Sequence, residues 1–248
     1  MFTIHGKPSL SRRSVLRALT AGSALALNAQ PHDRVTVVLV WVPALWCKSP
    51  KFNALTDIGI ALPAGIRPTN PTLEMLDNNS KGWQPKVPNL TSSWITYPEN
   101  QGRTFHGWRV ENGDENNERY LKGTFHWSGD GPDIVQSLVG SIHACGAWPP
   151  KRGSGSGARS EIGCKLGIAL PANARPPREA RFRVRAAEAG ANWTEALGNF
   201  IGGWQDAQTP PAAKPEDFLP NQKVLWATVT NKDLTQARAI RLIVTQDL

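Results

Sequence analysis

Hydrophobic residues in this chain gather into short runs, and most of these runs end at a proline or a glycine. The clearest is VTVVLVWV at residues 35–42, which is rich in β-branched residues and is closed by Pro43. A continuous apolar run of this length predicts a strand that is buried on both faces. Residues 178–186, REARFRVRA, instead alternate arginine with apolar side chains, which predicts a strand with one apolar and one basic face.

One phrase occurs twice, as IGIALPAGIRP at residues 58–68 and as LGIALPANARP at residues 166–176. Each copy predicts a short strand that stops at a proline, because proline lacks the N–H that a strand ladder needs. Gly65 and Asn173 hold the same place in the two copies, and both residue types tolerate a left-handed backbone. We therefore predict the same turn twice and interpret these residues as structural. The turn positions are Pro63, Gly65, Arg67, Pro68, Pro171, Asn173, Arg175 and Pro176.

Two pairs of neighbouring runs predict β-hairpins. RTFHGW and GTFHW flank the acidic stretch ENGDENNE, which predicts a long hairpin with His106 and His126 as cross-strand neighbours. KVLWATV and ARAIRLIVTQ predict a second hairpin at the C-terminal end. Helical spacing of apolar residues appears only in short segments, at residues 134–142 and 193–204.

Composition agrees with a fold made of short strands and many loops. The chain has 248 residues with 20 Pro, 22 Gly and 10 Trp, which is enough sequence for two domains of ordinary size. We predict a mainly β protein of two β-sandwich or jelly-roll-like modules with few short helices. The predicted division is an N-terminal basic segment at 1–32, a first module at 33–130 and a second module at 131–248.

The N-terminal segment has two interpretations. Residues 11–17, SRRSVLR, followed by the uncharged ALTAGSALALNA, resemble a twin-arginine export signal that would be removed near residue 26. The uncharged stretch is too short to span a bilayer as a mature helix. Alternatively, residues 10–28 form a basic amphipathic helix or arm that docks on a neighbouring molecule, with Arg12, Arg13 and Arg17 as its contacts.

Positive charge is concentrated in two stretches of the chain. The formal net charge is +8, and lysines and arginines gather in residues 1–67 and 151–183. Such a field attracts nucleic acid, an acidic membrane or envelope, or an acidic protein surface. Nucleic acid is the least favoured partner, because aromatic residues do not share a face with the arginines of residues 181–185. The basic, Gly/Ser-rich residues 149–160 predict a flexible loop, since they lack the GK[ST] ending of a phosphate-binding loop.

No sequence motif for catalysis or cofactor binding is present. The cysteines, Cys47, Cys145 and Cys164, lack the spacing of a zinc site and are interpreted as buried thiols, with a Cys145–Cys164 bridge as the alternative. Acidic residues concentrate in loops, and no metalloprotease, nucleotide-binding or dinucleotide-binding motif occurs. We therefore expect no catalytic residues, no metal, no cofactor and no enzymatic activity.

Tryptophans are the candidate contact residues, because an exposed indole offers a large amphipathic surface. The candidate surface contacts are Trp83, Trp94 and Trp108, which lie in loop-like segments rich in Asn, Pro and Gly or in the predicted hairpin.

The segment formed by a strand, LPAGxRP and a second alternating strand resembles the small β-domains of bacteriophage tail-fibre and minor tail proteins. That resemblance implies a β-sandwich or jelly-roll module that displays loops and assembles with copies of itself or with other virion proteins. It implies a non-enzymatic virion component, of the tail, the fibre or the capsid surface, with host-surface glycans as further partners. The alternative is an exported carbohydrate-binding protein, periplasmic or secreted, whose tryptophans stack on sugars.

Overall fold

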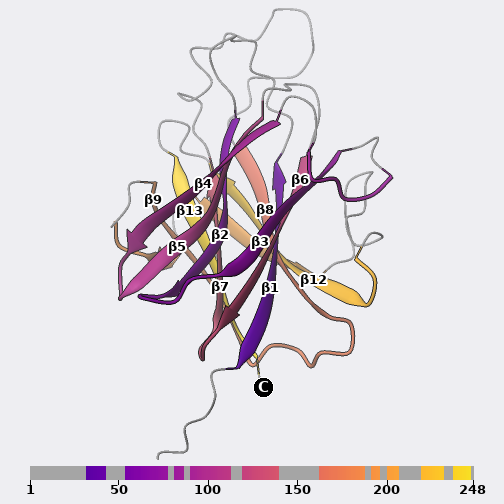
Figure 1. Ribbon diagram of the computed structural model, residues 1–248. Helices are drawn as coiled ribbons and strands as arrows, with labels where there is room; N and C mark the ends of the chain where they lie inside the picture. The colour runs from indigo at the N-terminus through magenta and orange to yellow at the C-terminus, as the bar shows by residue number, and fades with distance from the viewer. Residues whose placement is uncertain are drawn as a thin grey trace, which may run out of the picture. The chain divides into compact units, whose positions relative to one another are not determined.

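The computed structural model describes residues 32–42, 54–77, 81–86, 90–112, 119–139, 162–187, 191–195, 200–206, 219–231 and 237–246. Contacts divide the chain into residues 1–32 and one compact unit at residues 33–248. The described residues form strands and no helix (Figure 1). Accordingly, none of them belongs to a helix that could span a membrane.

The strands of the compact unit are β1 (Asp33–Val42), β2 (Ala54–Pro63), β3 (Thr69–Asp77), β4 (Leu90–Glu99), β5 (Arg103–Asn112), β6 (Arg119–Ser128), β7 (Asp133–Val139), β8 (Ile162–Pro171), β9 (Glu179–Ala186), β10 (Thr194–Glu195), β11 (Phe200–Asp206), β12 (Gln222–Asn231) and β13 (Arg238–Thr245).

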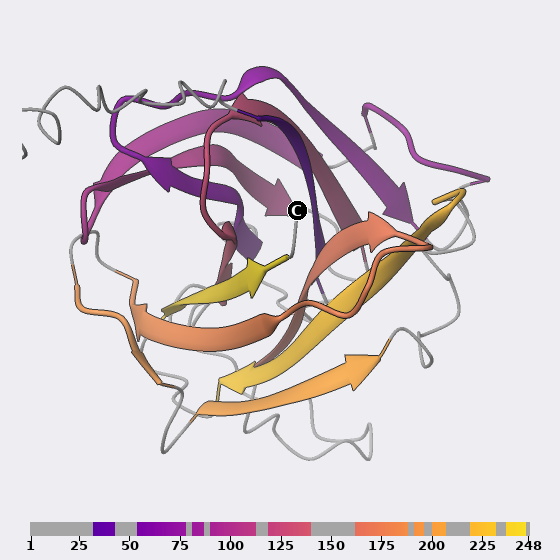
Figure 2. The same cartoon turned by 90° about the horizontal axis from the view of Figure 1, so that it is seen from below.

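These strands build two antiparallel sheets. The six-stranded sheet has the order β11-β12-β8-β1-β6-β3, and the seven-stranded sheet has the order β10-β9-β13-β7-β2-β5-β4. Figure 2 shows β8, β12 and β11 of the six-stranded sheet side by side. The main core draws on alternate residues of both sheets, such as Val38 and Val40 on β1 with Ile58 and Ile60 on β2. The predicted mainly β, sandwich-like fold is therefore confirmed.

Strand pairing in the first half of the unit, β1 to β6, is repeated in the second half, β7 to β13. The pairs β1–β6, β3–β6, β2–β5 and β4–β5 correspond to β7–β13, β9–β13, β8–β12 and β11–β12. The halves join through β1–β8 and β2–β7, which are themselves equivalent. Each sheet thus takes three strands from the first half and continues into strands of the second. The loop between β6 and β7 contains the predicted boundary between residues 130 and 131.

Both predicted hairpins are wrong, and for the same reason. β5 and β6 lie in different sheets, and so do their equivalents β12 and β13. His106 on β5 and His126 on β6 are therefore not cross-strand neighbours. In each half the chain crosses from one sheet to the other at this connection, as in jelly-roll topologies.

The two predicted helices are also wrong. Residues 133–139 form β7, a central strand that pairs with β13 on one side and with β2 on the other. Consecutive residues 133–137 are buried, so both faces of this strand are covered. Residues 194–195 and 200–206 form β10 and β11. Backbone pairing with β9 and β12 outweighs the weak local helical pattern of these segments.

The repeated phrase forms β2 and β8 with the turns that follow them. The Ile66 N–H donates to the Pro63 carbonyl at 3.1 Å, and the Ala174 N–H donates to the Pro171 carbonyl at 2.9 Å. Gly65 has the predicted positive φ of 90°, but Asn173 is not among the described non-glycine residues with positive φ. The expectation of a left-handed residue is therefore wrong in the second copy. The same hydrogen bond therefore closes there without a positive φ, as turns of type I allow.

Candidate interaction surface

The seven-stranded sheet ends at β4, whose side chains are unusually open to solvent. In the described part of the chain β4 pairs only with β5. Six of its ten residues are exposed, while Leu90 and Glu99 at its two ends are buried. Trp94, near the middle of the strand, is 43% exposed and is one of two large exposed hydrophobic residues that the described ranges contain.

Trp94 is held by an aromatic cluster that reaches into the core. Its ring meets that of Trp108 on β5 edge-to-face, with centroids 4.8 Å apart and an interplanar angle of 84°. Trp108 in turn lies 5.2 Å from Phe125 on β6, which is fully buried. Aromatic pairs of this geometry stabilise beyond their buried area. The exposed Trp94 ring is therefore held in one orientation by Trp108, which packs on the core residue Phe125.

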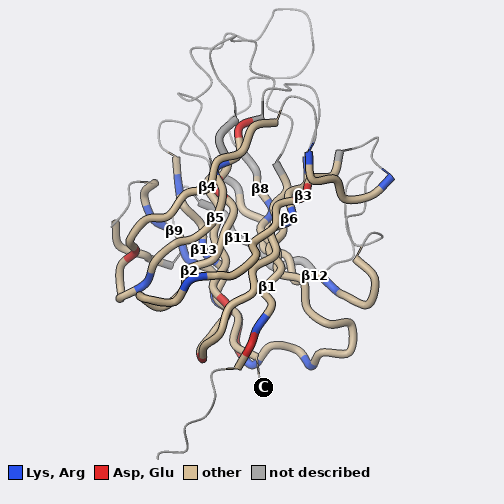
Figure 3. The backbone as a smooth tube through the Cα atoms, viewed as in Figure 1, with Lys and Arg blue, Asp and Glu red and all other residues tan. Residues whose placement is uncertain are grey.

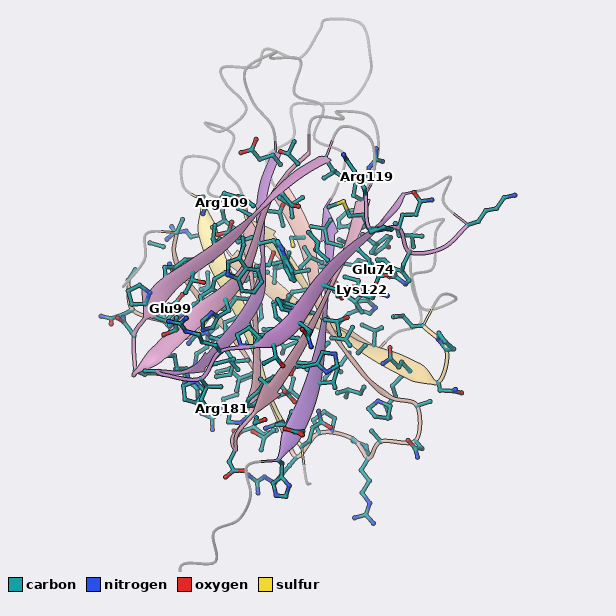
Figure 4. The ribbon with its side chains drawn as sticks, viewed as in Figure 1. Glu74, Glu99, Arg109, Arg119, Lys122 and Arg181 are labelled. Carbon is teal, nitrogen blue, oxygen red and sulfur yellow. The ribbon has the colours of Figure 1, made fainter. Side chains whose placement is uncertain are left out.

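The third candidate tryptophan lies elsewhere. Trp83 packs against a second apolar cluster, whose members are all outside the main core and include Tyr120 and Trp226. Lys122 lies over the Trp83 ring at 4.8 Å. It also forms an ion pair with Glu74 at 2.6 Å, and Figure 4 labels these two residues next to each other. Thus the structure brings Trp94 and Trp108 together and places Trp83 in a separate, partly buried cluster.

The remaining predicted site residues do not join this surface. Arg12, Arg13 and Arg17 lie outside the described residues. Arg67 and Arg175 follow the repeated turns and are exposed. Arg67 lies in the connection from β2 to β3, and Arg175 lies in the connection from β8 to β9. The eight turn positions therefore form two equivalent structural corners.

A buried charged cluster, which no sequence pattern predicts, anchors the end of β4. The Arg185 guanidinium lies 2.7 Å from one carboxylate oxygen of Glu99, and both side chains are fully buried. Arg241 lies 3.6 Å from the other oxygen. The Gln136 amide and the Trp193 indole N–H each donate to Glu99 at 3.1 Å.

The arginines of this cluster are further held by an aromatic ring and an amide. Arg241 and Arg185 lie 4.0 and 4.9 Å from the Trp193 ring centroid. Arg241 also donates to Gln136 Oε1 through Nε at 2.8 Å. Burial lowers the pKa of Arg241 to about 10, while Glu99 acts in the opposite direction. The guanidinium therefore stays charged at neutral pH and depends on its partners.

Desolvation also acts on Tyr97, the neighbour of Glu99 along β4. Its ring stacks on Phe105 at 4.7 Å, and burial raises the pKa of its hydroxyl, with Asp57 and Glu99 adding to the effect. Tyr97 thus stays neutral at physiological pH. Glu99 thus fixes one end of β4 against β9, β13 and Trp193, and Tyr97 holds the same end on β5, while Trp94 stays exposed.

The chemistry of these groups favours packing and binding. Cys164 is a free, buried thiol, and burial raises its pKa to about 12, which keeps it protonated. Because Cys164 is free, the alternative Cys145–Cys164 bridge is not formed, and Cys145 itself lies outside the described residues. Across the described ranges, no group of three or more His, Cys, Asp or Glu side chains could hold a metal ion.

Comparisons of the chain with models of protein families, with curated proteins and with solved structures give no match. A function for the chain is therefore inferred from the geometry above and from the resemblance of the LPAGxRP segments.

Proposed function

We propose that the protein is a non-enzymatic structural component of a bacteriophage virion, in the tail, the fibre or on the capsid surface. The observation that carries the proposal is the duplicated strand pairing, in which two jelly-roll-like halves share both sheets. Double-sheet jelly rolls are common in viral capsid proteins and in lectins. This support is an analogy of fold, joined to the resemblance of the LPAGxRP segments to phage tail domains.

The charged groups of the structure are consistent with a scaffold. Glu99 lies between two buried guanidinium groups, those of Arg185 and Arg241, and the three side chains connect distant strands. Such an arrangement specifies one packing of the strands more readily than it provides a reactive group. Contacts with other virion proteins would then use exposed features such as Trp94 and, in the part of the chain outside the described residues, the basic N-terminal segment.

The test is to purify the phage particles that contain this protein and to sequence its N-terminus. We expect the chain in intact particles, beginning at Met1, with the basic segment available as a docking arm. A native protein that begins near Leu27 and is found in the periplasm or the medium would contradict the proposal.

One observation favours a second candidate, an exported carbohydrate-binding protein. The exposed Trp94 ring, oriented by Trp108, has the form of a platform on which a sugar could stack. Binding to a glycan array that is lost in Trp94→Ala but kept in Trp83→Ala, together with a cleaved N-terminus, would support this candidate over the virion component.

A further inference from the structure

We infer that β4 is a self-association edge, at which a second copy of this chain adds its own β4 in antiparallel orientation. The inference extends the proposed function, in which copies of the chain assemble, by naming the surface and the partner. It starts from the backbone: within the described residues the outward side of β4 faces no other strand. Along residues 90–97 this edge presents a row of hydrogen-bonding groups to any strand that can reach it. At its other end, Glu99 bonds to Trp193, and the following residue, Asn100, bonds to Ala191.

Residues 90–97 of β4 lack the features that protect the edges β3 and β10, and the proline and the charge of the strand, Pro98 and Glu99, lie together at its end. Natural edge strands are usually protected by charge, proline, bulges or short length. β3, the edge of the other sheet, has Pro71, Glu74, a register shift between Thr69 and Thr72, and a bridge from Met75 to Gln84. β10 has only two residues.

The sequence of β4 is instead suited to pairing with itself. Residues 90–97, LTSSWITY, contain no charge, and Figure 3 shows β4 without a charged segment before its Glu99 end. Two copies in antiparallel register would therefore bring no like charges opposite each other. A two-fold axis makes the same surface meet itself, which requires antiparallel strands.

Covering this edge would bury the exposed ring of Trp94, which is energetically favourable. Trp94 lies at the middle of the uncharged stretch and remains 43% exposed in the single chain. In a β4–β4 pair the partner's strand would cover it, because cross-strand and diagonal neighbours lie within reach of an indole. Glu99 and Tyr97 fix the end of β4, so the edge is already ordered before a second copy binds.

The test uses the full chain and sedimentation velocity over a range of concentrations. The wild-type chain should form dimers, and Ser93→Lys should raise the dimer dissociation constant by about tenfold or more, because it places a charge on each copy of the edge. Ser93 is exposed, so the fold should survive, which circular dichroism would verify. Thr91→Lys, at a second exposed position of β4, is the substitute if Ser93→Lys fails to fold.

The matched controls are Ser93→Thr and Thr72→Lys. The first keeps the edge uncharged, and the second places the same charge on the exposed edge of β3. Both should dimerise like the wild type. A wild-type chain that stays monomeric, or dimers lost in Thr72→Lys but kept in Ser93→Lys, would overturn the inference. A monomeric chain recovered in purified virions would overturn it while leaving the proposed function in place.

Discussion

Replacing Glu99 by glutamine should destabilise the fold more than almost any other single isosteric change. Glu99 compensates two buried guanidinium groups, with Arg185 at 2.7 Å and Arg241 at 3.6 Å. Removing one partner of a buried ion pair typically costs about 3–5 kcal/mol, because the other charge remains buried without compensation. Glutamine keeps the size and one acceptor oxygen of glutamate. We therefore expect Glu99→Gln to lower the free energy of unfolding by about 3 kcal/mol.

The assay is urea unfolding at pH 7, followed by tryptophan fluorescence, with the slope of the transition checked for two-state behaviour. The chain offers a matched control in the Glu179–Arg181 pair, whose side chains are 42% and 52% exposed. Exposed pairs contribute about 0–1 kcal/mol, so Glu179→Gln should leave the unfolding midpoint nearly unchanged.

The result that would refute the reasoning is a Glu99→Gln protein as stable as Glu179→Gln. The charge of Glu99 would then contribute little, and Trp193 with Gln136 would have to hold the two arginines unaided. Equal losses in both variants would also contradict the argument, because burial would no longer distinguish the two ion pairs.

Three further predictions concern protonation and backbone geometry. Burial lowers the pKa of His106 below its usual 6.5, so stability present above that pH should be lost as the pH falls below it, and His106→Gln should flatten this dependence in unfolding titrations between pH 7 and 5. Gly65→Ala should cost about 1–2 kcal/mol in urea unfolding, because φ there is 90°, whereas Asn173→Ala should be nearly neutral. Gly59→Ala should destabilise more than Gly167→Ala, since the new Cβ would collide with the backbone carbonyl of His106 in the first case and with the side chains of Trp226 and Val224 in the second.

Each of these predictions has an outcome that would contradict it. An unchanged pH profile in His106→Gln would show that another group controls the acid limb. Equal losses in Gly65→Ala and Asn173→Ala would mean that the two turns share one backbone conformation. A Gly167→Ala protein that is less stable than Gly59→Ala would show that the aromatic ring over Gly167 is harder to displace than backbone.

Strand positions could be predicted from the sequence, because burial on one or both faces leaves a periodic pattern. Residues 35–42 and both copies of the repeated phrase form strands as expected. Strand partners could not be predicted in the same way. The runs on either side of residues 113–118 are close in sequence, yet each finds its partners in a different sheet, and local pattern contains no information about that choice.

The charged cluster was missed for a related reason. Residues 178–186 predict a strand with one apolar and one basic face, and on the basic face Arg181 is exposed. Arg185, on the same face, is buried because Glu99 reaches it from 86 residues away in the chain. The other members of the cluster include Gln136 and Trp193, which come from segments predicted to be helical. No spacing rule connects such residues before the sheets are assembled.

The two copies of the repeated phrase show how one scaffold supports two different surfaces. Gly59 and Gly167 are equivalent, and an aromatic ring lies over each, Phe105 in the first copy and Trp226 in the second. Gly59 is flanked by Gly107 and Gln136, whereas Gly167 is flanked by Trp226 and Leu39. The polar flank connects to the Glu99 cluster, and the apolar flank belongs to the cluster around Tyr120. The repeat therefore provides the strand and the room for a ring, while neighbouring strands determine whether the outer face is charged or apolar. The Glu99 cluster, which borders the first copy only, fixes the end of β4. This difference between the two copies therefore orders the strand edge at which we expect a second chain to bind.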